Sequence, residues 1–268
     1  MSIDGPADIP EVLRDKRRLD ADEKFPFACH SGLPCFNRCC ADVNIILTPL
    51  DVLRLARRVG VTTTEFLDEY ALLPITKDLQ LPVVMLKMGD GPERKCRFVG
   101  EQGCTVYEDR PWACRMYPLG MAIPPARAGL EPEPIYFLFE DDFCEGHGEQ
   151  TPWTARGWRA DQGIREHEEL EEGYRELVSH PWFIGGRQLD PRRMEMFHTA
   201  CYDLDKFRRF LFESTFLERF ELEPGLVEQI RTDDIALLRF AFRWLRYALF
   251  AEPTMTARPE APSTQRKA

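Results

Sequence analysis

Cysteine is the residue type in this sequence whose number and spacing point most directly to chemistry. Nine of the 268 residues are cysteines, and four of them fall within residues 27–40, the stretch FACHSGLPCFNRCC. Because thiolates bind zinc and iron–sulfur clusters, the sequence predicts a metal site held by sulfur. The eight candidate ligands are Cys29, Cys35, Cys39, Cys40, Cys96, Cys104, Cys114 and Cys144.

Disulfide bonds are the main alternative use of so many cysteines. The first twenty residues contain no apolar stretch typical of a secretory signal, and the cysteine total is odd. Both features argue against a disulfide framework, which belongs to oxidising compartments. We therefore expect a cytoplasmic protein whose thiols are free to bind a metal.

The spacing of the first four cysteines allows more than one arrangement. Cys35 and Cys39 are four residues apart and would project to the same side of a helical turn, and Cys29 can reach them through the bend at 32–34. The side chains of adjacent Cys39 and Cys40 diverge, so one can serve one centre while the other serves a second centre or none. Four thiolates suffice for zinc or a [4Fe–4S] cluster, and eight can hold two centres or one larger one.

Other polar residues near the cysteines have two interpretations each. Arg110 and Arg115 flank Cys114; they can offset thiolate charge and donate hydrogen bonds to sulfur, or they are ordinary surface arginines. His30 and His147 can complete a mixed zinc site or face solvent. The ninth cysteine, at position 201, lies on an apolar helical stripe and is expected in the core.

Short strands and two capped helices are expected to position the cysteines. A Thr-Pro pair at 48–49 predicts a helix that ends at Gly60, and a second helix begins at 62–64. A hairpin with its turn at 100–103 would bring Cys96 and Cys104 together, and a helix beginning at 109–111 carries Cys114. The strands are expected at 43–47, 83–88, 95–99, 104–107 and 134–139.

The second half of the sequence is expected to be helical. Helices are expected at 154–179, 191–220 and 224–250. Apolar residues recur at steps of three or four in the second segment, and the third is rich in large apolar residues. The fold class predicted is α+β, with an irregular cysteine-rich metal-binding half containing short strands, followed by a mainly helical half. The expected divisions are a mobile N-terminal arm at 1–26, a metal-binding domain at 27–150, a helical region packed on it at 151–251 and a disordered tail at 252–268.

Composition and missing motifs exclude several functions. The net charge is −10 and no long basic run occurs, so nucleic acid is not an expected partner. No stretch approaches the ~20 apolar residues of a membrane span. The sequence contains no GxSxG, P-loop, GxGxxG or HExxH motif, and no catalytic residue can be assigned from it.

The second cysteine block carries a family resemblance. The run from Cys104 to Pro118, CTVYEDRPWACRMYP, matches the arrangement C-x-x-Y-x-x-R-P-x-x-C-R-x-Y-P, and Cys35, Cys39 and Cys40 end the first block. On these residues, 27–148 of the sequence resemble the CxxCxxCC family of YkgJ-like zinc- or iron-chelating proteins, often labelled Fe–S oxidoreductases. Three residues separate Cys35 from Cys39, where the named pattern has two.

The resemblance implies three functions that remain open at this stage. It implies an iron–sulfur centre, [4Fe–4S] among the options, with a redox or electron-transfer role and an unknown redox partner or protein substrate. The iron–sulfur centre is the preferred interpretation, and the alternative is a structural zinc module without catalysis. Flagellin lysine methylases resemble the same family, which implies cluster-assisted methyl transfer as a third function. Whether the protein is an enzyme is left open.

Overall fold

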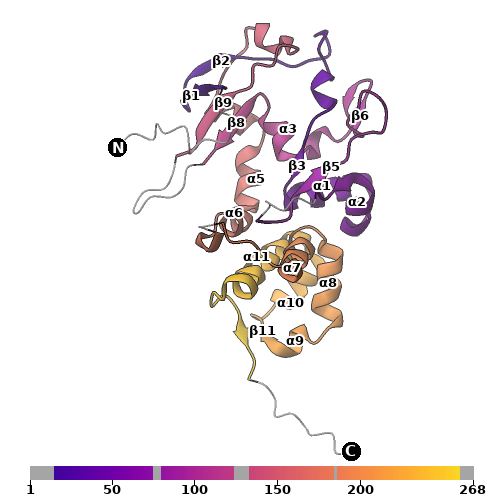
Figure 1. Ribbon diagram of the computed structural model, residues 1–268, viewed down its shortest axis with the longest axis vertical. Coiled ribbons are helices and arrows are strands. Elements are labelled where there is room, and N and C mark those ends of the chain that lie inside the picture. The colour runs from indigo at the N-terminus through magenta and orange to yellow at the C-terminus, as the bar shows by residue number, and fades with distance from the viewer. Residues whose placement is uncertain (1–14, 75–79, 124–132, 184–185, 260–268) are drawn as a thin grey trace, which may run out of the picture. The chain divides into compact units, whose positions relative to one another are not determined.

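The chain forms two compact units, and each of them is discontinuous in sequence (Figure 1). The computed structural model describes residues 15–74, 80–123, 133–183 and 186–259. One unit, here called the cysteine unit, comprises Met1–Ile45 and Met88–His167. The other, the helical unit, comprises Ile46–Lys87 and Glu168–Ala268. The fold is α+β with a strand-rich N-terminal part and a helical C-terminal part, which confirms the predicted class. The predicted domain limits at 27–150 and 151–251 remain a prediction.

Small antiparallel sheets and an apolar core build the cysteine unit. β1 (Arg17–Leu19), β9 (Ile135–Leu138) and β8 (Leu119–Ala122) pair in the order β1-β9-β8. β2 (Lys24–Pro26) pairs with β10 (Pro152–Thr154). Because alternate residues of a strand face opposite sides, each short strand buries only part of its side chains. The core consists of Leu19, Phe25, Phe27, Met116, Leu119, Tyr136, Leu138, Ala155, Trp158 and Ile164.

The N-terminal arm is shorter than predicted. Residues 1–26 were expected to be mobile, but β1 and β2 place residues 17–19 and 24–26 in sheets. Leu19 and Phe25 are the large apolar residues of 17–26, and both are buried in the core. Burial of these two side chains fixes the segment to the core, although its high charge had predicted a mobile arm. Residues 1–14 lie outside the described residues.

Short helical turns carry the cysteines of this unit. The predicted hairpin is present but short: β6 (Val99–Gly100) pairs with β7 (Gly103–Cys104), so Val99 faces Cys104. Gly103 adopts φ 116°, a conformation that favours glycine. The predicted helix around Cys114 is α3 (Trp112–Met116). The remaining elements are the 3₁₀ turns η3 (Arg38–Cys40), η4 (Tyr107–Asp109) and η5 (Glu145–Gly148), with α4 (Ala155–Asp161) and α5 (Ile164–Leu170).

The first part of the helical unit follows the predicted capping signals. α1 (Pro49–Val59) begins after Thr48, whose side chain accepts from the Asp51 N–H, and Gly60 ends it at φ 78°. α2 (Thr63–Tyr70) begins with an equivalent capping box between Thr62 and Glu65. A three-stranded antiparallel sheet of β3 (Ile46–Leu47), β5 (Val84–Leu86) and β4 (Ala71–Leu72) accompanies them.

Each of the three long helices predicted for the second half is divided into shorter ones. Gly163, at φ 64°, separates α4 from α5, and Asp203 caps α8 by accepting from the Lys206 N–H. Asp233 caps α11 in the same way. A capping carboxylate competes with continuation of the preceding helix, which the apolar periodicity alone does not reveal. The elements are α6 (Glu172–Val178), η6 (Pro181–Phe183), α7 (Pro191–Cys201), α8 (Leu204–Glu213), α9 (Phe216–Arg219), α10 (Leu226–Thr232) and α11 (Asp234–Phe250).

The C-terminal tail is ordered further than predicted. Residues 252–268 were expected to be disordered, but β12 (Thr256–Ala257) pairs with β11 (Phe220–Glu221). Met255 is buried beside this pair, and it supplies the apolar contact that a tail rich in proline and threonine otherwise lacks. Residues 260–268 lie outside the described part.

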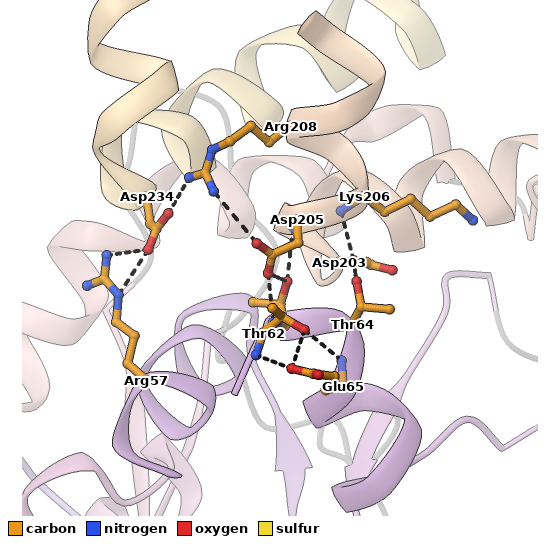
Figure 2. A network of polar contacts seen from close by, with 10 residues as sticks. Arg57, Thr62, Thr64, Glu65, Asp203, Asp205, Lys206, Arg208 and Asp234 are labelled. Carbon is orange, nitrogen blue, oxygen red and sulfur yellow. Dashed lines mark hydrogen bonds and ion pairs between the residues drawn. The ribbon is translucent and has the colours of Figure 1, made fainter. Parts of the chain in front are cut away.

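A polar network joins four helices within the helical unit (Figure 2). Asp205 of α8 accepts hydrogen bonds from the Thr63 N–H (2.7 Å) and hydroxyl (2.6 Å) at the start of α2. Asp234 of α11 accepts from Arg57 of α1, at 3.0 Å from Nε and 2.6 Å from Nη2, and from Arg208 of α8. The network thus satisfies its charges with partners from the same unit. Among the helices that the structure describes, none combines the length and apolarity needed to cross a bilayer.

Candidate metal centre

All eight predicted ligands lie in the cysteine unit, and they fall into two groups of four. We call Cys29, Cys35, Cys39 and Cys144 the first thiol group, and Cys40, Cys96, Cys104 and Cys114 the second thiol group. The groups are defined by which chain segments the backbone brings together and by which thiols alter one another's pKa. The two groups meet at the adjacent residues Cys39 and Cys40.

A close backbone approach assembles the first thiol group. The Ala28 N–H donates to the Gly146 carbonyl at 3.1 Å, which brings Cys29 beside the segment that carries Cys144. A Cβ atom at Gly146 would lie 2.6 Å from the Ala28 carbonyl oxygen and 2.8 Å from the Phe27 ring. Only glycine fits this approach without movement of the backbone. Position 146 therefore matters for the site although it offers no ligand atom.

The sulfurs of the first thiol group also influence one another. The Glu145 N–H donates to Cys35 Sγ at 3.2 Å, so Cys35 lies next to the segment of Cys144. Cys29 keeps contact with solvent, yet partial burial of its sulfur raises its pKa to about 11, and the negative charges of Cys39, Cys144 and Cys35 contribute to the rise. Like charges must be close to have this effect.

A strand-like contact and the hairpin assemble the second thiol group. The Cys96 N–H donates to the Cys40 carbonyl at 2.6 Å, and Ala41 forms an isolated antiparallel bridge with Lys95. The hairpin then places Cys104 opposite Val99. These contacts confirm the expectation that the hairpin brings Cys96 and Cys104 near each other, since the charge of Cys104 is among the causes that raise the pKa of Cys96.

Peptide N–H groups point at the sulfurs of the second thiol group. Burial raises the pKa of Cys96, and hydrogen bonds from the Phe98 and Val99 N–H groups oppose the rise. Burial likewise raises the pKa of Cys104, against a hydrogen bond from the Val106 N–H. An N–H donor stabilises the thiolate over the thiol. These loops therefore favour ionised sulfur more than a plain apolar environment would.

The adjacent cysteines form a hydrogen-bonded pair. Cys40 donates to Cys39, which lowers the pKa of Cys39 to about 7 and raises the pKa of Cys40. Burial and the negative charges of Cys39, Cys114 and Cys96 raise the pKa of Cys40 further. Cys39 is thus the thiol in this pair that ionises near neutral pH. Because the charge of Cys114 acts on Cys40, we count the cysteine of α3 in the second thiol group.

Both predicted arginines are buried, so they are not ordinary surface arginines. The Arg110 guanidinium stacks 3.7 Å from the centre of the Tyr107 ring, and its charge acts to lower the pKa of Cys104 against the effect of burial. Arg115 instead donates to backbone carbonyls, among them those of Arg110 (2.9 Å) and Gln162 (3.0 Å). Arg110 therefore acts on sulfur, whereas Arg115 holds the surrounding backbone.

Tyr117 is a site residue that the sequence analysis named only as part of a motif. Burial raises the pKa of its hydroxyl, and a hydrogen bond from this hydroxyl to Cys144 raises it further. The hydroxyl also lies 3.4 Å from Asp141 Oδ2, and the backbone carbonyl of Asp141 accepts from the Cys144 N–H at 2.8 Å. The Cys114-Arg-Met-Tyr order was the available signal, because Tyr117 follows a candidate ligand by three residues.

The histidines and the ninth cysteine have other surroundings. His30 is exposed, with Nε2 3.7 Å from the Glu149 carboxylate. His147 places Nε2 2.9 Å from the Phe139 carbonyl oxygen, and its Nδ1 has no hydrogen-bond partner among the described residues. Cys201 is fully buried in α7 of the helical unit, as its apolar stripe predicted.

The donor set fits a thiolate-binding metal in its chemistry. Zinc and iron–sulfur clusters take sulfur ligands in fours, and each thiol group contains four. Within the described residues, which include all eight cysteines, no three Cys, His, Asp or Glu side chains surround a common point in the manner of metal ligands. The fit therefore rests on the type and number of the donors.

The helical unit has a cavity of about 310 Å³ beside its polar network. Its charged lining is already engaged: Arg57 and Arg208 bind Asp234, and Glu65 accepts from Thr62 at the start of α2. Asp205 is held by the start of α2 as well. The cavity therefore belongs to the packing of this unit and gives no candidate site.

Comparison with known families leads to the same class of protein. A cysteine-rich unit with two sets of four thiols and N–H donors on sulfur defines a candidate metal-chelating protein. Residues 28–145 match the model of the CxxCxxCC family, described as a "putative zinc- or iron-chelating domain". This span includes all eight predicted ligands, and the match confirms the resemblance seen in the sequence. Neither a curated protein nor a solved structure matches the chain.

Proposed function

We propose that the cysteine unit binds an iron–sulfur centre through its thiols and that the protein serves in electron transfer or other redox chemistry. The family description supports chelation of zinc or iron, and the choice of an iron–sulfur centre is our own. When bound, such a centre accepts and returns electrons at a potential that hydrogen bonds to sulfur help to set. The proposed ligands are the eight cysteines of the two thiol groups.

The observation that carries this proposal is the direction of the peptide N–H groups. Cys35 accepts from Glu145, and Cys96 and Cys104 accept from residues two or three positions further along the chain. A buried free thiol behaves as a small apolar group and has little need of such donors. Donors that stabilise thiolates are instead expected where sulfur is a ligand.

Two other groups are suited to accompany sulfur ligands. The Arg110 charge near Cys104 offsets part of the negative charge that four thiolates would concentrate. The Tyr117 hydroxyl donates to Cys144, and a hydrogen bond to ligated sulfur shifts the reduction potential upward. Both roles tune a centre rather than hold it.

Zinc is the second candidate, and the family description favours it equally. A closed four-thiolate zinc site would be structural and would have no redox activity. The same thiol groups would hold it. Metal analysis therefore separates the two functions without any change of the protein.

The test is metal and sulfide analysis of the full chain purified without oxygen. We expect iron with acid-labile sulfide, a brown colour and visible absorption that a reductant bleaches. Stoichiometric zinc in colourless protein would replace the proposal with the structural one, and protein without metal would refute both.

A set of cysteine variants tests the ligands. We expect Cys35→Ser, Cys39→Ser, Cys104→Ser and Cys114→Ser each to lower the bound metal. The matched control is Cys201→Ser, which changes a cysteine of the helical unit and should keep the full content. Equal loss in the control would contradict the assignment of the ligands to the cysteine unit.

A further inference from the structure

We propose that the eight thiols hold two separate metal centres, one in each thiol group, which divide at the peptide bond between Cys39 and Cys40. This inference rests on the proposed function, because it concerns the same ligands. It adds the number of centres and the assignment of every ligand, which neither the sequence spacing nor the family match provides.

The local backbone separates the two adjacent cysteines. Both lie in the 3₁₀ turn η3 (Arg38–Cys40), where three residues make one turn and consecutive side chains point about 120° apart. Side chains that diverge in this way can serve two different centres.

The chain segments that surround Cys39 and Cys40 are held by separate sets of backbone contacts. The contact between Ala28 and Gly146 closes the first thiol group. The contact between Cys40 and Cys96, continued by the hairpin to Cys104, closes the second. Neither set of contacts uses a residue from the other. The loop between Cys35 and Cys39 also touches the hairpin, because the Asn37 side chain donates to the Gly100 carbonyl at 3.3 Å. The two groups therefore adjoin, while each has a closing contact of its own.

A contact to sulfur agrees with this division. The Glu145 N–H donates to Cys35 Sγ at 3.2 Å. Cys35 therefore lies beside the neighbour of Cys144, which belongs to the same thiol group.

The number of ligands also favours two centres. Four thiolates complete the coordination of a tetrahedral zinc ion or of a [4Fe–4S] cluster, and eight would exceed either. Consecutive Cα atoms are 3.80 Å apart, so ligands at adjacent positions keep the two centres near each other. If both are iron–sulfur centres, their unpaired electrons should interact.

The decisive experiment counts exposed thiols molecule by molecule in the unmodified protein. The metal-loaded full chain is treated with a chelator until about half of the metal is lost, and free thiols are alkylated at once in the folded state. Intact mass then gives the number of labels on each molecule, and peptide mapping gives their positions. Two centres predict molecules with zero, four and eight labels, with the four confined to one thiol group.

The other outcomes each have a defined meaning. Molecules with only zero or eight labels would show one shared centre and would overturn the inference while leaving the proposed function intact. Four labels spread over both groups would overturn the ligand assignment. Protein that carries no metal before treatment would instead refute the proposed function.

Paired variants give a second, independent readout. Cys35→Ser removes a ligand of the first thiol group and Cys114→Ser removes one of the second; each should halve the metal content, and the double variant should lose nearly all of it. In iron-loaded protein, each single variant should also abolish the electron spin interaction between the reduced centres. Complete loss of metal in both folded single variants would point to one centre.

Discussion

The two units of this protein use their polar groups in opposite ways. In the helical unit, Asp205 and Asp234 accept hydrogen bonds from threonine and arginine side chains, so the charges are satisfied from within (Figure 2). In the cysteine unit, peptide N–H groups and a tyrosine hydroxyl point at thiols, which are weak acceptors until they ionise. The carboxylates of the helical unit are thus paired with side chains of the same unit, whereas the donors of the cysteine unit face groups that accept strongly only as thiolates.

Their apolar cores differ as well. The helical unit is organised around α11, whose buried side chains are those of Leu237, Leu238, Phe240, Ala241, Phe242, Trp244, Leu245 and Leu249. The cysteine unit has its own core under the sheet β1-β9-β8, but its ligand-bearing turns are short and irregular. Loss of a metal should therefore loosen one unit selectively.

Metal removal is the change with the largest expected effect. Structural zinc contributes about 10–16 kcal/mol in small zinc domains, although this unit also has a core of its own. We expect the metal-free protein to lose hydrogen-exchange protection in peptides covering 28–41 and 95–115, with peptides covering 191–250 unchanged. Equal loss of protection in both regions would contradict the expectation that metal removal loosens the cysteine unit selectively.

A core truncation should affect the other unit. Phe197 of α7 is fully buried, and Phe197→Ala is expected to cost about 3–5 kcal/mol of unfolding free energy without altering metal content. Denaturant unfolding and metal analysis together provide the measurement. Phe210→Ala, at a phenylalanine that is 41% exposed, is the control and should cost much less. Metal loss in the Phe197 variant would mean that metal binding in the cysteine unit depends on the packing of the helical unit.

The close approach at Gly146 provides a test of the first thiol group alone. Gly146→Ala forces its Cβ against the Ala28 carbonyl, which should cost about 1–3 kcal/mol and separate Cys29 from Cys144. We expect the bound metal to fall by about half, measured as metal per folded chain. Gly148→Ala is the control, since its Cβ would meet nothing within 4 Å. Full metal content in the first variant would show that this approach does not matter for the site.

Acid should reveal the smallest effect, in the helical unit. Burial acts to raise the pKa of Asp234, but hydrogen bonds from Arg208 and Arg57 outweigh it and hold the pKa below its usual range. The stability it contributes is therefore present above the ordinary pKa of about 4 and is lost as the pH falls through the lower, folded-state pKa.

We expect Asp234→Asn to remove the acid-dependent part of the unfolding free energy. The loss should be under about 1 kcal/mol, because the side chain is partly exposed. Thermal unfolding between pH 6 and pH 2 is the measurement. Asp68→Asn on the exposed side of α2, where the described residues provide no partner, should leave the pH profile as it is. An unchanged profile in the Asp234 variant would contradict the assignment.

The parts of the fold that could be predicted are those determined by residues close together in the sequence. The ends of α1 and α2 follow from Thr48, Gly60 and Thr62, because caps act within a few residues. The later helices were predicted too long, since Asp203 and Asp233 interrupt an apolar pattern that continues across them. Strand order and the division into units depend on distant pairings, which no local pattern contains.

The candidate site was predictable as a set but not as an arrangement. Spacing and residue type identified the eight thiols, since sulfur chemistry is a property of the residue itself. The approach of Cys144 to Cys29 depends on the contact between Ala28 and Gly146, which are more than a hundred residues apart in the sequence. Tyr117 was recognised only as a member of a motif, because its role as a donor depends on the approach of the distant Cys144.

The position of the second thiol group has a consequence for the segment Ile46–Lys87. The chain leaves the cysteine unit after Cys40 and returns to it before Cys96, and these two residues are joined by a backbone hydrogen bond. A metal held by both would therefore act as a cross-link that closes the excursion into a loop. By the chain-entropy model such a closure is worth about 4 kcal/mol, so this ligand-free part of the helical unit should unfold more readily once the metal has left.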